Sequence, residues 1–404
     1  MKIRPLVSLA LFGAAACQPD KQSRSGPATE TRDSAGIRIV ENAKPQEGSR
    51  VWRVASEPAV SIGEHEGEDP YLLYQVWDAT KLPDGRIVVA NSGDGQLRVF
   101  DANGIHLETW GGRGEGPGEL PELIHVEPWR GDSIAAWFGP RRGITLFGPD
   151  GSFGRNIFLE VDSQDPMAVF IQPGEVMAGG LILAGQHPHV RDPVVVEIRD
   201  AEGGLLSSLG RHSGDERYII NEGTDQARGG QPIFGAMAMQ VPWGDLVVHN
   251  LNNRYEIRAF AHDGSLARIV RRDHASQAPT GEEIDAYIEE RASWHPVDLS
   301  PDEIEEYKAE RRKELQSIPV AERIPAFTTI KVDRLDHLWV QEYEPPGQER
   351  PGSLWTVFDP EGRVLGFVET PDGLDIFEIG EDYVLGQSSD EMNVEFVQVW
   401  PLER

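Results

Sequence analysis

The segment Asp84-Gly-Arg-Ile-Val-Val-Ala-Asn-Ser92 begins a pattern that continues in Gln96-Leu-Arg-Val-Phe-Asp101 and ends in Trp110-Gly-Gly-Arg-Gly-Glu-Gly-Pro-Gly-Glu-Leu120. Its two apolar runs are short and uninterrupted, which favours β-strands that are covered on both faces. Polar residues and glycines separate the runs and predict turns between them. The segment therefore predicts a small antiparallel sheet, followed by a glycine-rich connection to the next unit.

A turn similar to the one after Phe100 recurs along the chain. Each copy is a tetrapeptide that ends in glycine and follows a short strand rich in Val, Ile or Phe. The tetrapeptides are Asp101–Gly104, Gly148–Gly151, Asp200–Gly203, Ala261–Gly264 and Asp359–Gly362. Their final glycines are 47, 52, 61 and 98 residues apart. Repeats of roughly 40 to 50 residues with several strands each are typical of β-propeller blades, and the longest interval predicts one repeat plus an insertion.

Six apolar runs, one in each repeat, give the number of blades. They occupy residues 87–90, 134–137, 181–184, 246–249, 338–341 and 383–386. We therefore predict an all-β fold, a six-bladed propeller of four-stranded antiparallel blades. The last repeat offers only three strands, and the segment Ala59–Ile62 is well placed to supply the fourth. An N-terminal strand would then close the ring and leave only short sheet edges.

The long interval between the fourth and fifth repeats contains the helical region. A first helix is expected to start at Thr280-Gly-Glu-Glu, and Ser300-Pro-Asp-Glu303 is a capping box with proline at the first helical position. We predict a helical hairpin inserted between blades 4 and 5, within about residues 276–325. A solvated scaffold is the simpler interpretation of this hairpin, and a cap over the propeller mouth is the alternative.

The N-terminal residues have the pattern of an export signal. A positively charged start and a short apolar run predict a signal peptide over residues 1–16, too short to span a bilayer. The small residues before Cys17, the single cysteine, resemble the lipobox of bacterial lipoproteins, in which that thiol is acylated. An ordinary secretory signal is the alternative. Residues 17–35 lack large apolar side chains and are expected to form a flexible tether, with the propeller over residues 36–404.

This pattern also predicts a location. We expect a lipid-anchored protein of the bacterial cell envelope that faces the periplasm or the cell surface. The outer membrane is favoured because Gln18, and not Asp, follows the cysteine.

Composition narrows the class of partner. The chain has 404 residues, of which 39% are hydrophobic, so it can bury a sizeable core. Its 67 acidic and 38 basic residues give a formal charge of -29, which repels nucleic acid and anionic lipid. We therefore expect no nucleic-acid partner, and membrane contact through the lipid anchor only. We also expect a monomer, with an envelope protein, peptide or glycan as its partner.

The repeat resembles a known one. Residues 84–120, and a second copy at 244–257 with its Asn-Leu-Asn-Asn-Arg loop, resemble the NHL repeat of six-bladed propellers. The whole chain is similar to bacterial lipoproteins with NHL-repeat or TolB-like propellers. The resemblance implies the fold and little chemistry. In such propellers one face collects the loops between second and third strands together with the joints between blades, and this face is the expected binding site.

Polar side chains on these loops are the candidate ligand-binding residues. They are Asn91, Arg141, His187, His189, His249, Asn250, Arg254 and Glu342. We expect them around the mouth of a central channel. The histidines with Glu342 could hold Zn²⁺, and Asn91, Asn250 and Glu342 could hold Ca²⁺. The simpler interpretation is that the asparagines cap loop backbone and the histidines are hydrogen-bonded.

Enzyme motifs are missing from the sequence. It contains no Gly-x-Ser-x-Gly elbow, no phosphate-binding loop and no His-Glu-x-x-His helix. We therefore predict a non-catalytic binding or scaffold module for a protein, peptide or glycan, without a cofactor. The alternative is a metal-dependent hydrolase or lyase, similar to lactonases, with Ca²⁺ or Zn²⁺ in the central channel.

Overall fold

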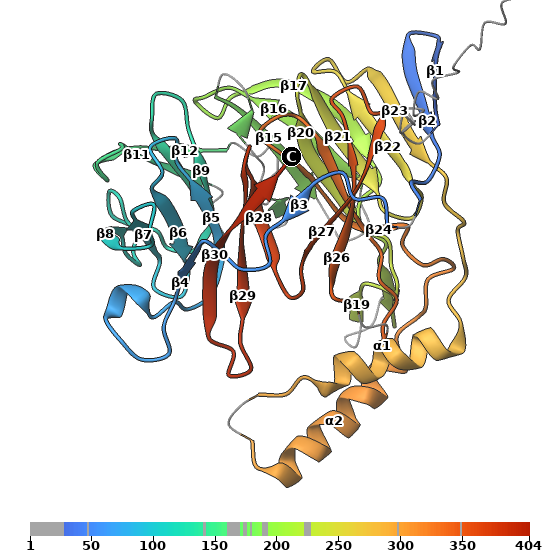
Figure 1. Ribbon diagram of the computed structural model, residues 1–404. Helices are drawn as coiled ribbons and strands as arrows, with labels where there is room; N and C mark the ends of the chain where they lie inside the picture. The colour runs from blue at the N-terminus through green and yellow to red at the C-terminus, as the bar shows by residue number, and fades with distance from the viewer. Residues whose placement is uncertain are drawn as a thin grey trace, which may run out of the picture.

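The fold is seen in a computed structural model, which describes residues 28–46, 48–139, 143–159, 170–172, 176–177, 180–187, 193–221, 228–296, 299–347 and 350–404. Its strands form six antiparallel blades, a six-bladed β-propeller, as the sequence predicted (Figure 1). First strands of several neighbouring blades contact one another, and the first strands surround the centre of the ring.

The blades follow one another along the chain. Blade 1 consists of β5 (Val76–Lys81), β6 (Ile87–Asn91), β7 (Gln96–Phe100) and β8 (His106–Gly111). Blade 2 consists of β9 (Leu123–Pro128), β10 (Ile134–Phe138), β11 (Gly143–Phe147) and β12 (Phe153–Phe158). Blade 3 consists of β13 (Phe170–Gln172), β14 (Val176–Met177), β15 (Leu181–His187), β16 (Val194–Arg199) and β17 (Leu205–His212). A hairpin of β18 (Tyr218–Ile220) and β19 (Arg228–Gly230) precedes blade 4.

The second half of the ring repeats the arrangement. Blade 4 consists of β20 (Ala238–Trp243), β21 (Leu246–Leu251), β22 (Glu256–Phe260) and β23 (Leu266–Arg272). Blade 5 consists of β24 (Phe327–Val332), β25 (Leu338–Glu342), β26 (Gly352–Phe358) and β27 (Val364–Pro371). Blade 6 consists of β28 (Asp375–Ile379), β29 (Tyr383–Ser389) and β30 (Glu395–Glu403).

Apolar contacts between blades explain the uninterrupted strands. The side chains of β6 are buried on both faces, because one face packs on blade 2 and the other on blade 6. Fully burying one such Val or Ile side chain contributes about 1.5–3 kcal/mol. Glycines in the turns allow neighbouring blades to pack closely. Gly151 has a φ of +75°, and a Cβ there would lie 2.2 Å from the indole nitrogen of Trp110 in blade 1.

An N-terminal strand closes the ring, as predicted. Strand β4 (Val60–Ile62) pairs antiparallel with β30, so that Ile62 lies opposite Val397 and Val60 opposite Val399. Strand β3 (Arg53–Val54) pairs with the end of β30. The fourth strand of blade 6 therefore comes from the other end of the sequence.

The residues before β3 form two further strands that the sequence did not predict. Strand β2 (Ile37–Asn42) lies parallel to β23, the outer strand of blade 4, and β1 (Thr29–Ser34) pairs with β2. Val51 then donates its backbone N–H to Phe367 of blade 5, at 2.9 Å. Residues 29–62, which we call the N-terminal strap, thus contact the outer strands of blades 4, 5 and 6 (Figure 1, blue).

The predicted flexible tether is wrong in its last part. We expected residues 17–35 to be flexible, but Thr29–Ser34 is a strand. Most side chains of this strand are exposed, so backbone pairing with β2 holds it in place. Its sequence therefore lacks the hydrophobic pattern from which a strand is predicted. The predicted signal peptide, Cys17 and the tether up to residue 27 lie outside the described residues.

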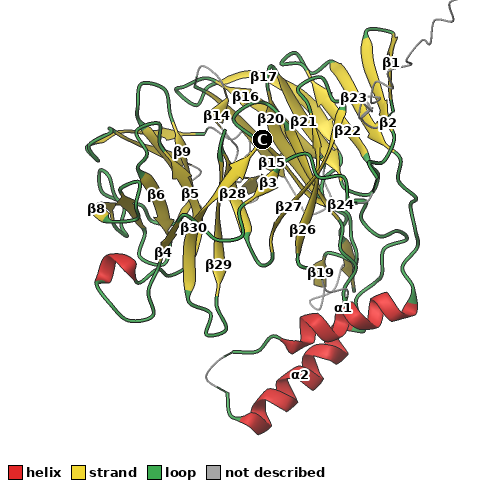
Figure 2. Ribbon diagram, viewed as in Figure 1, coloured by secondary structure: helices red, strands yellow, loops and turns green. Residues whose placement is uncertain are grey.

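The predicted helical hairpin is present between blades 4 and 5. It consists of α1 (Gly281–Ser293) and α2 (Pro301–Leu315), and the Thr280 hydroxyl accepts from the Glu283 N–H at 3.2 Å. Ile288 and Leu315 pack with Phe234, which precedes blade 4. Both helices lie on one side of the sheets (Figure 2). No helix in the described part of the chain is both long and apolar enough to span a membrane.

Candidate functional site

The expected loop-rich face exists, and the candidate residues lie at its strand ends. Because alternate strands are antiparallel, second strands end on the side where each blade connects to the next. Asn91 ends β6, His187 ends β15, and Glu342 ends β25. Arg141 and His189 lie outside the described residues, and for His187 only the strand position is described.

Three adjoining cavities run along blades 4 and 5 on this face. The largest of these three, of about 600 Å³, lies between blade 5, the strap and α1. A cavity of about 400 Å³ shares Pro325 with it, and one of about 220 Å³ shares Leu251, Asn253 and Arg254 with the second. We call the three cavities the blade-4/5 groove. The candidate residues that line this groove are His249, Asn250, Arg254 and Glu342.

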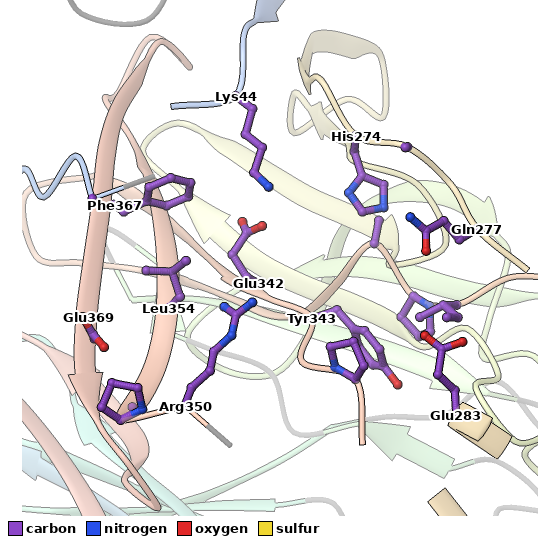
Figure 3. A pocket seen from close by; sticks show the side chains of 18 of the residues that line it. Lys44, His274, Gln277, Glu283, Glu342, Tyr343, Arg350, Leu354, Phe367 and Glu369 are labelled. Carbon is purple, nitrogen blue, oxygen red and sulfur yellow. The ribbon is translucent and has the colours of Figure 1, made fainter. Parts of the chain in front are cut away.

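Glu342 lies in the cavity between blade 5, the strap and α1 (Figure 3), and it joins two blades. Arg272 of β23 donates to its two oxygens at 2.7 and 2.9 Å. The hydroxyls of Tyr255 and Thr356 donate to Oε1 at 2.9 and 2.7 Å. Burial and the charge of Glu342 raise the pKa of Tyr255 well above its ordinary value, so this phenol stays a neutral donor. The carboxylate is therefore the centre of a polar joint between blades 4 and 5.

His249 lies at the other end of the groove, against blade 3. Its ring centre is 4.7 Å from that of His212 in β17, and its Nε2 lies 3.2 Å from the Ser213 carbonyl oxygen. Burial and nearby Arg258 lower the pKa of His212, although a hydrogen bond to Leu209 opposes them. His212 is therefore neutral at pH 7, and two imidazoles face the groove.

Two predicted asparagines bind loop backbone. Asn91 accepts from the Tyr74 N–H at 2.7 Å and donates to Asp94 at 2.8 Å. Asn250 donates to the Leu251 carbonyl at 2.7 Å. These contacts match the capping role that was the simpler interpretation. Asn91 belongs to blade 1 and lies outside the groove.

Most of the described candidates belong to second strands, which lie one position out from the centre of each blade. His249 contacts blade 3, and Glu342 contacts blade 4, because second strands lie one position away from the centre of each blade. First strands surround the centre instead. The groove brings four of the eight candidates together.

A polar cluster on the first strands was missed. His125 of β9 contacts the carboxylate of Asp78 in β5 and lies 3.6 Å from Glu127. Glu127 accepts from the Trp137 indole and from the Val176 N–H, each at 2.7 Å. Burial alone would lower the pKa of His125, but the two carboxylates outweigh it and raise that pKa well above its usual value. The cluster therefore ties the first strands of blades 1, 2 and 3 together.

The sequence pattern that could have indicated this cluster is an alternation of polar and apolar residues in β9. In β9, His125 and Glu127 are separated by the buried Val126, which places both polar side chains on one face of the strand. The predicted site was based on the ends of the uninterrupted second strands, so it did not include these first-strand residues.

The described side chains include no group of three or more His, Cys, Asp or Glu residues arranged to hold a metal ion. The side chains of His187 and His189, part of the predicted zinc set, are outside that description.

Comparisons with known proteins agree on the fold. No family model and no curated protein matches the chain. A Bacteroides fragilis protein described as exported has a structure with a TM-score of 0.50 and 12% identity, covering 89% of this chain and 99% of that one. A DUF4221 family member from Bacteroides vulgatus has a TM-score of 0.49 and 11% identity, with coverages of 87% and 99%. The calcium-binding regucalcin from Agrobacterium tumefaciens has a TM-score of 0.38 and 11% identity, with coverages of 87% and 94%. These likenesses show the fold alone.

Proposed function

We propose that the chain is a non-catalytic binding propeller that holds an extended polar ligand, a segment of a peptide or glycan, in the blade-4/5 groove. The observation that carries the proposal is the continuity of three cavities through shared lining residues. Cavities of this size suit ligands of several hundred Å³.

The groove walls favour recognition of polar groups. Arg254, Asn253, Glu322 and Arg323 line its middle part. Asn253 and Arg254 stand on the short loop between β21 and β22, and Glu322 and Arg323 on the segment between α2 and β24. The sheet pairing of β21 and β22 fixes the ends of the short loop, so little ordering of Asn253 and Arg254 is required when a ligand binds. Such a surface offers both hydrogen-bond donors and hydrogen-bond acceptors along its length.

Replacing Arg254 tests this proposal. The side chain is exposed and lines two of the three cavities, so Arg254→Ser should leave the fold intact and remove a central donor. We expect the wild-type protein to bind members of peptide or glycan arrays. We expect the variant to bind the same members at least about tenfold more weakly.

The matched control is Arg113→Ser, an exposed arginine after blade 1, outside the groove. It should bind as the wild type does. If no array member bound the wild-type protein, or if Arg254→Ser bound every ligand normally, the groove would not be the binding site.

We further propose an extracytoplasmic location with a lipid anchor at Cys17. The export pattern of residues 1–16 supports it, as does the exported Bacteroides fragilis protein of similar fold. Gln18 after the cysteine favours the outer membrane.

Cys17→Ser should release the protein from membranes, because no thiol would remain for acylation. Cell fractionation and the mass of the N-terminal peptide measure this, with Ser23→Ala as the control that should stay membrane-bound. Fractionation of Cys17→Ser with membranes at the wild-type level would show that the anchor is wrong.

A further inference from the structure

The acidic side chains of the cavity between blade 5, the strap and α1 already have partners. Glu342 is bound by Arg272. Glu369 accepts from Arg50 of the strap at 2.9 Å. Glu283 accepts from the Thr280 N–H at 2.8 Å in the cap of α1. Each negative charge on the wall is therefore engaged within the protein.

Two cations on the same wall are not engaged in this way. Lys44 belongs to the strap and Arg350 to the loop before β26, and both point toward the centre of the cavity (Figure 3). Among the described residues, neither forms an ion pair or a hydrogen bond. Arg350 also acts at longer range on Glu344, whose pKa burial raises. Two cations without an ion-pair partner among the described residues stand out in a chain of net charge -29.

A neutral donor lies beside them. His274 lines the cavity, and burial, Arg272 and Lys44 lower its pKa, against the opposing charge of Glu342. A neutral imidazole can donate one N–H to an anion without adding charge. Lys44, Arg350 and His274 therefore place three donors on the lining of one cavity.

The remaining wall is aliphatic. Leu354, Ile324 and Pro351 line it, and Phe367 is only 1% exposed. Tyr343 packs edge-on against Phe234. The apolar part of this lining is mainly aliphatic, which suits an apolar side chain of a ligand.

Resting on the proposed function, we infer that the ligand is a peptide and that this cavity holds its C-terminal carboxylate between Lys44 and Arg350, with an apolar last side chain against Leu354. The preceding residues would follow the groove toward Arg254. An anionic group next to an apolar side chain at a chain end is the chemistry of a peptide C-terminus, and charge-assisted hydrogen bonds from two cations would fix it.

The test compares six-residue peptides that end in Leu or Phe, with the other positions randomised, as free acids and as C-terminal amides. Titration calorimetry with the wild-type protein should show the free acids binding at least about tenfold more tightly than the amides. Lys44→Met and Arg350→Met should each weaken binding of the acids by about tenfold and leave the amides unaffected. Both side chains are exposed, and melting curves should match the wild type.

Lys308→Met, in α2 and outside the cavity, is the matched control and should bind the acids normally. Equal affinity for acids and amides would overturn the carboxylate site, while the groove would stand if Arg254→Ser still lost its array ligands. Binding of uronic-acid oligosaccharides, dependent on Lys44 and Arg350, would overturn the peptide assignment. Failure of every peptide and every array member would overturn both proposals.

Discussion

Deletion of residues 1–63 should lower the melting temperature by at least about 10 °C, whereas deletion of residues 1–35 should lower it by only a few degrees. The longer deletion removes β2, β3 and β4, including Val40 and Ile62, which are at most 1% exposed. Each buried side chain contributes about 1.5–3 kcal/mol, and the lost strands also leave the edges of β23 and β30 unpaired. The shorter deletion removes only β1, which is mostly exposed.

Differential scanning calorimetry of the two truncated proteins measures this difference. The 1–35 deletion is the control, since it keeps every strand that pairs directly with a blade. Equal melting temperatures for the two truncated proteins would contradict closure by the strap.

Arg272→Met should reduce the free energy of unfolding by about 3–5 kcal/mol, because it leaves the buried carboxylate of Glu342 without its cation. Replacing both partners, in Arg272→Met with Glu342→Leu, should recover much of the loss, since no charge then remains buried. The single variant should also regain stability as the pH falls, because protonation removes the unpaired charge. Urea unfolding at several pH values measures all three effects.

Arg258→Met is the matched control in the same blade. Arg258 pairs with Glu256 at 2.7 Å, but its side chain is 52% exposed. Exposed pairs contribute at most about 1 kcal/mol. Similar losses for Arg258→Met and Arg272→Met would mean that the joint between blades 4 and 5 does not depend on the buried ion pair.

Local patterns made the blades predictable. Uninterrupted strands such as Ile87–Asn91 are buried on both faces, and the glycine turns mark where one blade packs on the next. Counting strands in the last repeat was enough to predict that Ala59–Ile62 would close the ring. The strap strand β2 was not predictable in this way, because its pairing with β23 joins residues about 230 positions apart and is set by the packed ring.

The candidate site was predictable in part. Loop positions pointed to His249, Asn250, Arg254 and Glu342, which line the groove. The direction in which each side chain points depends on how one blade packs on the next, so the sequence did not predict the groove. Lys44, His274 and Arg350 come from the strap, a blade joint and a loop, and only the closed ring brings them to one cavity.

The closure of blade 6 also sets an order of events during synthesis. Ile62 pairs opposite Val397, so the partner of β4 is translated 335 residues after β4 itself. Throughout that interval β4 has no strand to join, and the five earlier blades have no closed ring to stabilise them. Contacts this distant along a chain slow folding, because a very large loop must close before they form. The nascent propeller therefore stays open, and accessible to chaperones or to threading through a narrow pore, until β30 has been made.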